Sequence, residues 1–370
     1  MELISSINDV DVSISDMFDD SNPSTSRMLQ DSPAQFATLV EHASSADNLC
    51  KSSGTNDFKL SGQDALLYDR QIRLWGIEAQ QKIMRSNTLL LGKNGILEET
   101  MKNLILSGMR VTFANDVHVT PEDVANSFFL RESDIGNNHA ESLVSRMRSM
   151  ASDKHKVTFF KSTLLEDNIF NDLPLSHNID FDLKQFDAIV CAMESYDILK
   201  LIHLDEICRT NGIAFFASKG NYTQGFFFQD LNIHTVSEKM SRSAGNVIIN
   251  YRSLKDALSE PQLPNRCDDA IRTVLAYILM QKEHLNMDYN FFTRDHHMDQ
   301  LQVICNKIGA SVEGVLQHVK NDGKYFSITS AVLGGYIALE IRKFITKQHE
   351  TIPSLCVFDM ERSTVVTSMV

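Results

Sequence analysis

Short apolar runs alternate with segments of helical periodicity between residues 64 and 230. In each run the apolar residues follow one another with little alternation, which is typical of strands buried on both faces. These runs cover residues 88–91, 110–114, 156–160, 186–192 and 213–217. Helical periodicity covers residues 64–84, 95–106, 136–150 and 196–209. The alternation predicts an α/β fold whose sheet is doubly wound and mainly parallel, with right-handed crossovers.

The pattern changes after residue 235, where helical segments follow one another. Their periodicity covers residues 268–285, 298–319 and 329–347, with a break near Gly309 in the second. The polar and aromatic residues 285–300 are expected to form a loop, and residues 354–366 are expected to form a terminal hairpin. This part of the chain therefore adds helices to the sheet without extending the parallel strand–helix pattern.

The N-terminal segment differs from the rest in charge. The chain carries a formal net charge of −13, and residues 1–60 hold ten acidic and three basic residues, so more than half of that charge lies there. A segment this polar and this rich in serine cannot bury enough apolar surface to offset the entropy that it would lose on ordering. We therefore expect a disordered acidic tail at residues 1–58. The rest divides into a sheet-forming part at 59–235, a small helical insertion at 236–328, and a helix and hairpin at 329–370 that complete the fold.

Composition excludes several classes of protein. The acidic balance argues against a general nucleic-acid binder, which needs a basic face. The six cysteines form no C-x-x-C pair, which argues against a zinc ribbon and a thioredoxin-like redox pair and favours a reducing compartment. No apolar run reaches the ~18 residues of a membrane span. The acidic N-terminus is not expected to be a secretory signal.

The first candidate site is the turn after the first strand, in the string LLLGKNGILEE. A strand that leads through glycines into a helix is the setting in which a helix N-terminus binds phosphate. Gly92 and Gly95 are present, but Leu97 occupies the place of a third glycine. Glu98 and Glu99 suit the helix dipole but would repel an anionic ligand. A nucleotide site and a purely structural turn both remain open on these residues.

The end of the second strand offers Asn115, followed by Asp116. In nucleotide-binding sheets an acid at this place accepts a hydrogen bond from a ribose hydroxyl, about 20 residues after the glycines. An amide can accept the same bond, but without the strengthening that a charge provides. Asn115 therefore weakens the nucleotide interpretation.

The string QDALLYDRQIRLWGIEAQ contains the only tryptophan, Trp75. Arg70 and Arg73 lie three residues apart, on one face of the predicted helix. Two arginines beside an aromatic side chain fit an interface, an anion clamp, or an ordinary helix surface above a core tryptophan. The residues alone leave these alternatives open.

Two smaller constellations carry less weight. Cys191 lies at the end of a strand, but no histidine near it in sequence would activate the thiol, so a buried and inert cysteine is expected. Asp295, His296, His297 and Asp299 have metal-binding side chains, but close polar residues in a loop rarely form a site. We therefore expect no metal site.

The string YDRQIRLWG resembles the N-terminal signature of activating enzymes for ubiquitin-like proteins, the ThiF/MoeB-like family. Further strings that resemble the family follow in the same order: LLLGKNG, NLILSGM, VTPED, IGNNHAESL and AVLGGYIALEI. The resemblance covers about residues 60–370. VTPED after the second strand is most similar to the small, non-catalytic subunits of the branch that activates SUMO.

The resemblance implies a Rossmann-like pseudo-adenylation half that pairs with a large catalytic subunit. In this family only one half binds ATP and Mg²⁺ and adenylates the C-terminal glycine of the modifier. A cysteine of the large subunit then takes the acyl group as a thioester. The chain is therefore expected to hold no cofactor and no catalytic cysteine, to contact SUMO only through the complex, and to reside in the nucleus with some in the cytoplasm.

Four departures from the family pattern converge on the nucleotide site. Leu97 replaces the last glycine, and Asn115 replaces the acid that binds ribose. Asn126 stands where the family has an arginine, and His139 stands where it has a lysine. The resemblance thus implies a degenerate nucleotide site, built on Gly92 and Gly95 and altered at these four positions.

The family resemblance assigns a role to Arg70, the first arginine of YDRQIR. In the family this residue reaches across the heterodimer to the phosphates of ATP in the active half, and Arg73 and Trp75 are interface candidates. The alternatives are the equivalent subunit for another ubiquitin-like modifier, a stand-alone NAD-binding Rossmann protein, and a scaffold without the arginine role. The missing third glycine and Asn115 count against NAD, and the intact YDRQIRLWG string counts against a pure scaffold.

Overall fold

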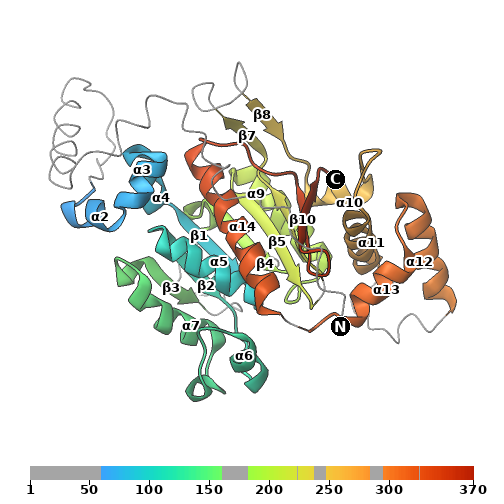
Figure 1. The fold of residues 1–370 in the computed structure, drawn as a ribbon, viewed down its shortest axis with the longest axis horizontal. Coiled ribbons are helices and arrows are strands. Elements are labelled where there is room, and N and C mark those ends of the chain that lie inside the picture. The colour runs from blue at the N-terminus through green and yellow to red at the C-terminus, as the bar shows by residue number, and fades with distance from the viewer. Residues whose placement is uncertain (1–59, 161–181, 223, 237–246, 284–294, 325) are drawn as a thin grey trace, which may run out of the picture. The chain divides into compact units, whose positions relative to one another are not determined.

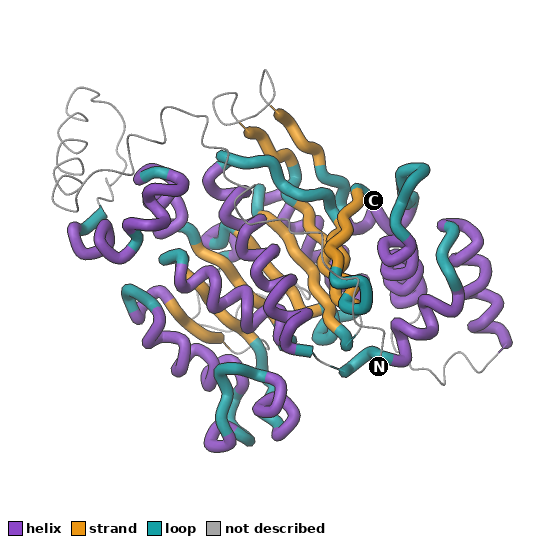
Figure 2. The backbone as a smooth tube through the Cα atoms, viewed as in Figure 1, coloured by secondary structure: helices purple, strands orange, loops and turns teal. Residues whose placement is uncertain are grey.

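The computed structural model describes residues 60–160, 182–222, 224–236, 247–283, 295–324 and 326–370 (Figures 1 and 2). The predicted tail at residues 1–58 lies outside the described residues. The chain separates into two compact units, residues 1–77 and residues 78–370, which are described in turn.

The described part of the first unit contains α2 (Gly62–Leu67) and α3 (Asp69–Trp75), and α4 (Ile77–Arg85) starts at its last residue. The prediction of a single helix at residues 64–84 is therefore wrong, because the segment forms three short helices. Tyr68 ends α2 and begins α3. Gly76 ends α3 with a φ of 86°, a left-handed conformation that a helix cannot contain.

The second unit is built on a sheet of eight strands, in the order β10-β9-β6-β5-β4-β1-β2-β3. Strands β3, β2, β1, β4 and β5 are parallel, whereas β6, β9 and β10 join antiparallel. The strands are β1 (Asn87–Leu91), β2 (Arg110–Ala114), β3 (Val157–Phe160), β4 (Ala188–Ala192), β5 (Ala214–Gly220), β6 (Gln224–Asp230), β9 (Leu355–Asp359) and β10 (Thr364–Ser368). This arrangement confirms the doubly wound, mainly parallel sheet, with its topological switch point between β1 and β4.

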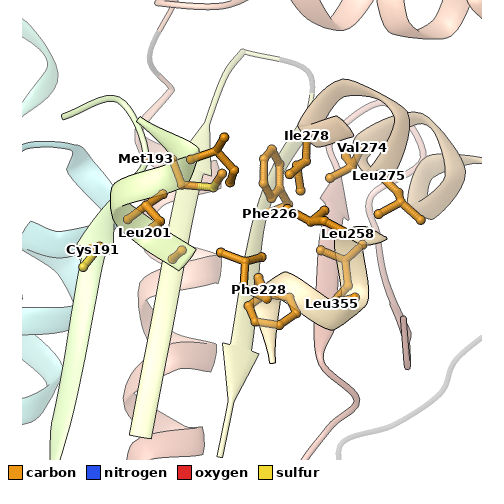
Figure 3. Packing of buried hydrophobic residues seen from close by; sticks show 14 of the residues in the cluster. Cys191, Met193, Leu201, Phe226, Phe228, Leu258, Val274, Leu275, Ile278 and Leu355 are labelled. Atoms are coloured by element: carbon orange, nitrogen blue, oxygen red, sulfur yellow. The ribbon is translucent and has the colours of Figure 1, made fainter. Parts of the chain in front are cut away.

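Helices cover both faces of this sheet. The α-helices of this unit that follow α4 are α5 (Gly95–Leu106), α6 (Pro121–Asn126), α7 (His139–Met147), α9 (Ile198–Asn211), α10 (Leu254–Ser259), α11 (Asp269–Glu283), α12 (Asp295–Ile308), α13 (Val312–Lys320) and α14 (Ser327–Thr346). Of these, α12 and α13 pack chiefly against α11. Side chains of α9, α10 and α11 pack with those of β4, β5 and β6 in one large hydrophobic cluster (Figure 3). Strand residues such as Phe215, Phe226 and Ile189 are fully buried in it, as their apolar runs predict.

Helices α5 and α14 lie side by side over the sheet (Figure 1). Gly334 makes this close approach possible. A Cβ atom added there would lie 2.8 Å from the backbone nitrogen of Thr100 and 2.9 Å from the carbonyl oxygen of Ile96, both on α5. Adjacent Gly335 would place its Cβ atom in open space. Only the first glycine of the pair is therefore required by packing.

Three details differ from the sequence-based expectations. Helix α7 begins at His139, after Gly136 with a φ of 83°, and the side chain of Asn138 caps it. Residues 295–300 are helical, because Met298 continues the apolar face of α12. An antiparallel pair, β7 (Ile233–Val236) and β8 (Val247–Asn250), was not predicted.

Within residues 236–328 the described segments thus include strand β8 as well as helices. The proposed boundaries at 235 and 328 stay predictions.

Among the described helices, none combines the length and the apolar character that crossing a bilayer requires.

Candidate functional site

The candidate site lies at the carboxyl ends of β1, β2 and β4, beside the switch point of the sheet. Gly92 follows β1 with a φ of 93°, which an L side chain rarely adopts. A Cβ atom there would also lie 2.6 Å from the Oγ atom of Ser195, which follows β4. The same Oγ atom accepts a hydrogen bond from the backbone N–H of Lys93 at 3.0 Å. Gly92 is therefore required by the local conformation of the turn, whether or not a nucleotide binds.

The N-terminus of α5 is capped by the protein itself. The Oδ1 atom of Asn94 accepts a hydrogen bond from the backbone N–H of Leu97 at 2.9 Å. The Leu97 side chain is fully buried, so it fills space that a glycine would leave open. Gly95 opens the helix, where a Cβ atom would lie 2.6 Å from the Oγ atom of Ser330 on α14. The helix end that would hold a phosphate thus has one of its donors satisfied internally.

Asn115, His139 and Glu98 form a buried hydrogen-bonded chain across this region. The Nδ2 atom of Asn115 lies 3.2 Å from the Nδ1 atom of His139. The Nε2 atom of His139 lies 3.1 Å from the Oε1 atom of Glu98. His139 is fully buried, and its ring centroid lies 6.0 Å from that of Phe113. Two positions that depart from the family pattern therefore bind each other.

The partners of Asn115 fix the direction of each bond in this chain. Its Oδ1 atom accepts from the backbone N–H of Ala140 at 3.3 Å, and its Nδ2 atom donates to the carbonyl oxygen of Gly92 at 3.1 Å. The Nδ1 atom of His139 must then be an acceptor, so the proton is on Nε2 and is donated to Glu98. An aspartate at position 115 would face the Gly92 carbonyl oxygen with an acceptor. The amide is therefore the chemically matched group.

The outer edge of the site is also internally bonded. The Oγ atom of Ser127 donates to the Oε2 atom of Glu98 at 2.5 Å. Lys93 pairs with Asp123 of α6 at 2.7 Å. Burial opposes the charge of Asp123, but hydrogen bonds from Lys93 and Thr120 hold the pKa of this carboxyl below its usual value. The one lysine of the glycine turn is thus held by a protein carboxylate.

Asn126 is not brought to this chain of bonds. Its Nδ2 atom donates to the carbonyl oxygen of Glu122 at 3.0 Å, within its own helix α6. Of the predicted site residues, Gly92, Leu97, Asn115 and His139 therefore share the carboxyl end of the sheet in one bonded region. Asn126 bonds the backbone of its own helix, and among the described residues no hydrogen bond joins it to that region.

Sequence reasoning missed Glu194, which follows β4. Its carboxylate accepts hydrogen bonds from the Nδ2 atom of Asn94 at 3.0 Å and from the backbone N–H of Gly220 at 3.3 Å. Desolvation by its surroundings raises the pKa of Glu194, while nearby Lys219 opposes that rise. The available signal was a polar side chain just beyond the end of a buried strand, since β4 ends at Ala192. A polar side chain after β2 drew attention to Asn115 in the same way.

Cys191 lies within β4 and is fully buried, and this burial raises the pKa of its thiol. This agrees with the expectation of an inert cysteine. The thiolate, which is the nucleophilic form, is therefore not accessible at this strand end.

The arginines of YDRQIRLWG lie in the first unit, on α3. Arg73 bonds Asp69 through its Nε atom at 3.2 Å, one turn earlier on the same helix. Trp75 is half-buried. Arg70 is exposed, and no hydrogen bond or ion pair engages its side chain within the described residues. Of the two arginines, Arg70 is thus the one whose guanidinium has all its donors available.

Comparison with known proteins places these observations in a family context. The ThiF family model matches residues 68–369. SUMO-activating enzyme subunit 1 of Homo sapiens is 31% identical over 186 residues, which is 50% of this chain and 50% of that protein. The protein of the same name from Dictyostelium discoideum is 23% identical over 323 residues, covering 82% of this chain and 93% of its own length.

The chain spans about half the length of the first of these relatives. Among solved structures, E. coli MccB is similar with a TM-score of 0.50 and 12% identity, over 82% of this chain and 69% of that chain. At this identity the likeness concerns the fold. It agrees with the mainly parallel sheet and its flanking helices.

Proposed function

The chain belongs to the ThiF family, and from this membership we propose that it is the non-catalytic subunit of a heterodimeric SUMO-activating enzyme. The relatives named SUMO-activating enzyme subunit 1 support this choice of modifier. In this proposal the large subunit binds ATP and Mg²⁺, adenylates SUMO and carries the catalytic cysteine. The present chain holds no cofactor and contacts SUMO only as part of the complex.

The observation that carries the proposal is the bonded chain of Asn115, His139 and Glu98. In an ATP-binding half, the corresponding region must offer free donors to phosphate and a free acceptor to ribose. Here the amide, the imidazole and the carboxylate satisfy one another, with hydrogen-bond lengths of 3.2 and 3.1 Å. Lys93 is held in the same way by Asp123. A nucleotide would have to break these buried bonds, at a cost of about 1–3 kcal/mol for each group left unpaired.

Arg70 is the residue that we propose acts in trans. A guanidinium placed beside the phosphates of ATP in the large subunit would stabilise the charge that develops on the leaving pyrophosphate. The exposure of Arg70 and its available donors fit this role. Arg73, which bonds Asp69, and half-buried Trp75 fit a supporting role at the interface.

The test is ATP–pyrophosphate exchange by the assembled complex of this chain with a large activating-enzyme subunit. Arg70→Ala is expected to leave assembly intact and to lower the rate of SUMO adenylation by about a hundredfold or more, as for other arginines supplied in trans. Arg73→Ala in the assembled complex serves as the comparison and is expected to keep most of the rate. Adenylation at the wild-type rate by the assembled Arg70→Ala complex would overturn the assignment.

The proposal includes a location in the nucleus, with some protein in the cytoplasm. No run rich in lysine and arginine encodes nuclear import within this sequence, so import is expected to depend on the large subunit. Fluorescence microscopy of the tagged chain tests this. Depletion of the large subunit is expected to shift the signal toward the cytoplasm, and an unchanged nuclear signal would contradict it.

A further inference from the structure

A polar cavity with a volume of about 970 Å³ lies beside α7. Its walls come from residues 128–138, from the outer surface of α7 and from Phe159 of β3. Arg131, Arg146 and Arg148 all line it. Asn138 also lines it, and its Nδ2 atom donates to the carbonyl oxygen of Asn115 at 3.2 Å, so the cavity adjoins the candidate site at the start of α7. The proposed function does not use the cavity.

Backbone carbonyl groups hold two of these guanidinium groups in place. The Nη1 atom of Arg131 donates to the carbonyl oxygens of Phe128 at 2.9 Å and Leu130 at 2.8 Å. The Nε atom of Arg148 donates to the carbonyl oxygen of Val157 at 3.0 Å. Each group keeps further N–H donors beyond those used in these bonds. Because the side chains are already oriented, a ligand would lose less entropy on binding them.

The charges along the wall do not cancel. Arg146 forms a paired contact with Asp134, in which Nε lies 2.7 Å from Oδ2 and Nη2 lies 2.8 Å from Oδ1. Hydrogen bonding from Arg146 holds the pKa of Asp134 below its usual value, so this carboxylate stays charged and compensated. Glu141 is the other acid among the lining residues. Because Arg146 and Asp134 compensate each other, the charges of Arg131 and Arg148 outnumber that of Glu141. The cavity therefore carries an excess of positive charge.

An aromatic pair adds an apolar surface to this charge. Phe128 and Phe129 are arranged edge to face with their ring centroids 5.3 Å apart, and 78% of Phe128 is exposed. The volume lies within the range of about 300–1,000 Å³ that is typical of small-molecule sites. The planar fork of arginine matches phosphate oxygens in two-point contacts, which a lysine does not.

We propose that this cavity binds a small phosphorylated molecule, with its phosphoryl group on Arg131 and Arg148 and its remaining part against Phe128. The ion pair of Arg146 with Asp134 frames the site and leaves the other two guanidinium groups for the ligand. Glu141 limits the affinity, because its carboxylate lines the same cavity as the bound anion.

Inorganic pyrophosphate is the probe, and its binding to the full chain is measured by isothermal titration calorimetry at low ionic strength. Arg148→Gln and Arg131→Gln are each expected to weaken binding by about tenfold, the effect of losing one charge-assisted hydrogen bond. Arg110→Gln removes the same charge from an exposed position that does not line the cavity, and it is expected to bind as the wild type does. Glu141→Gln is expected to tighten binding by about threefold, whereas exposed Glu132→Gln leaves it unchanged.

Circular dichroism of each variant confirms that it is folded before binding is compared. The proposal is overturned if pyrophosphate shows no saturable binding, or if Arg110→Gln weakens it as much as Arg148→Gln does. Binding of a phosphoserine peptide without binding of pyrophosphate would overturn the assignment to a small molecule. An equal effect of Glu141→Gln and Glu132→Gln would show that overall charge, rather than the cavity, governs the affinity.

Discussion

Replacing His139 by phenylalanine tests whether the bonded chain in the degenerate site is structural. The phenyl ring is somewhat larger than the imidazole, and it can still pack beside Phe113, whose centroid lies 6.0 Å from that of the histidine. Two bonds are lost, to Asn115 and to Glu98. Asn115 keeps its bonds to the backbone, so most of the cost falls on Glu98, which loses the N–H donor to its Oε1 atom.

The expected magnitude follows from the burial of these groups. Glu98 is only 7% exposed, so its carboxylate cannot replace the lost donor with bulk water. Leaving a buried group unsatisfied costs about 1–3 kcal/mol, and more if it is charged, so we expect a loss of about 2–4 kcal/mol in the free energy of unfolding. A double-mutant cycle with Glu98→Gln is expected to give a coupling energy of about 1–2 kcal/mol.

The assay is urea denaturation followed by circular dichroism, with the slope m compared between variants. His118→Phe is the matched control, because His118 is exposed and the same substitution there is expected to change stability by less than about 0.5 kcal/mol. If His139→Phe costs no more than this control, or if the double-mutant cycle shows no coupling, the chain of bonds does not stabilise the site and the reasoning fails.

Three further predictions concern the fold. Gly334→Ala should lower the free energy of unfolding by about 2–3 kcal/mol, because its Cβ atom meets the backbone of α5. Adjacent Gly335→Ala should be neutral or stabilise by up to about 1 kcal/mol. Equal effects of the two substitutions in thermal or urea unfolding would contradict the close approach. Burial and the nearby carboxylate of Asp230 raise the pKa of Asp205 to about 8, so the free energy of unfolding should fall as pH rises from about 4 to about 8. Asp205→Asn should remove much of this pH dependence in urea unfolding. Burial lowers the pKa of His318 to about 4, so the free energy of unfolding should fall as pH decreases from about 6.5 to about 4. If urea unfolding of His318→Gln at a series of pH values shows the same pH dependence as the wild type, this prediction is refuted.

Much of the sheet was predictable from the sequence because its strands are buried on both faces. Strand β1, for example, is an unbroken apolar run after its first two residues, and it is buried over four of its five positions. The pair β7 and β8 was missed because its strands are short and carry exposed apolar residues such as Ile233 and Ile248, which do not form a buried run. The break at Tyr68 between α2 and α3 also has no sequence signal, because tyrosine is a tolerable helix residue.

The candidate site was predictable in part. The altered positions Leu97, Asn115 and His139 stood out against the family pattern, and the structure brings them to one end of the sheet. Their partners did not stand out: Glu98 lies 41 residues from His139 in the sequence, and only the fold places the two side chains 3.1 Å apart. Glu194 was also missed, because its hydrogen bonds to Asn94 and Gly220 depend on how β4 and β5 are paired.

The most direct test of the proposed function is ATP-dependent thioester formation between SUMO and a co-expressed large activating-enzyme subunit, with and without this chain. The account predicts that thioester forms only when the chain is present, while the isolated chain shows no saturable binding of ATP. Thioester formation at the same rate without the chain, or tight binding of ATP or NAD by the chain alone, would contradict it.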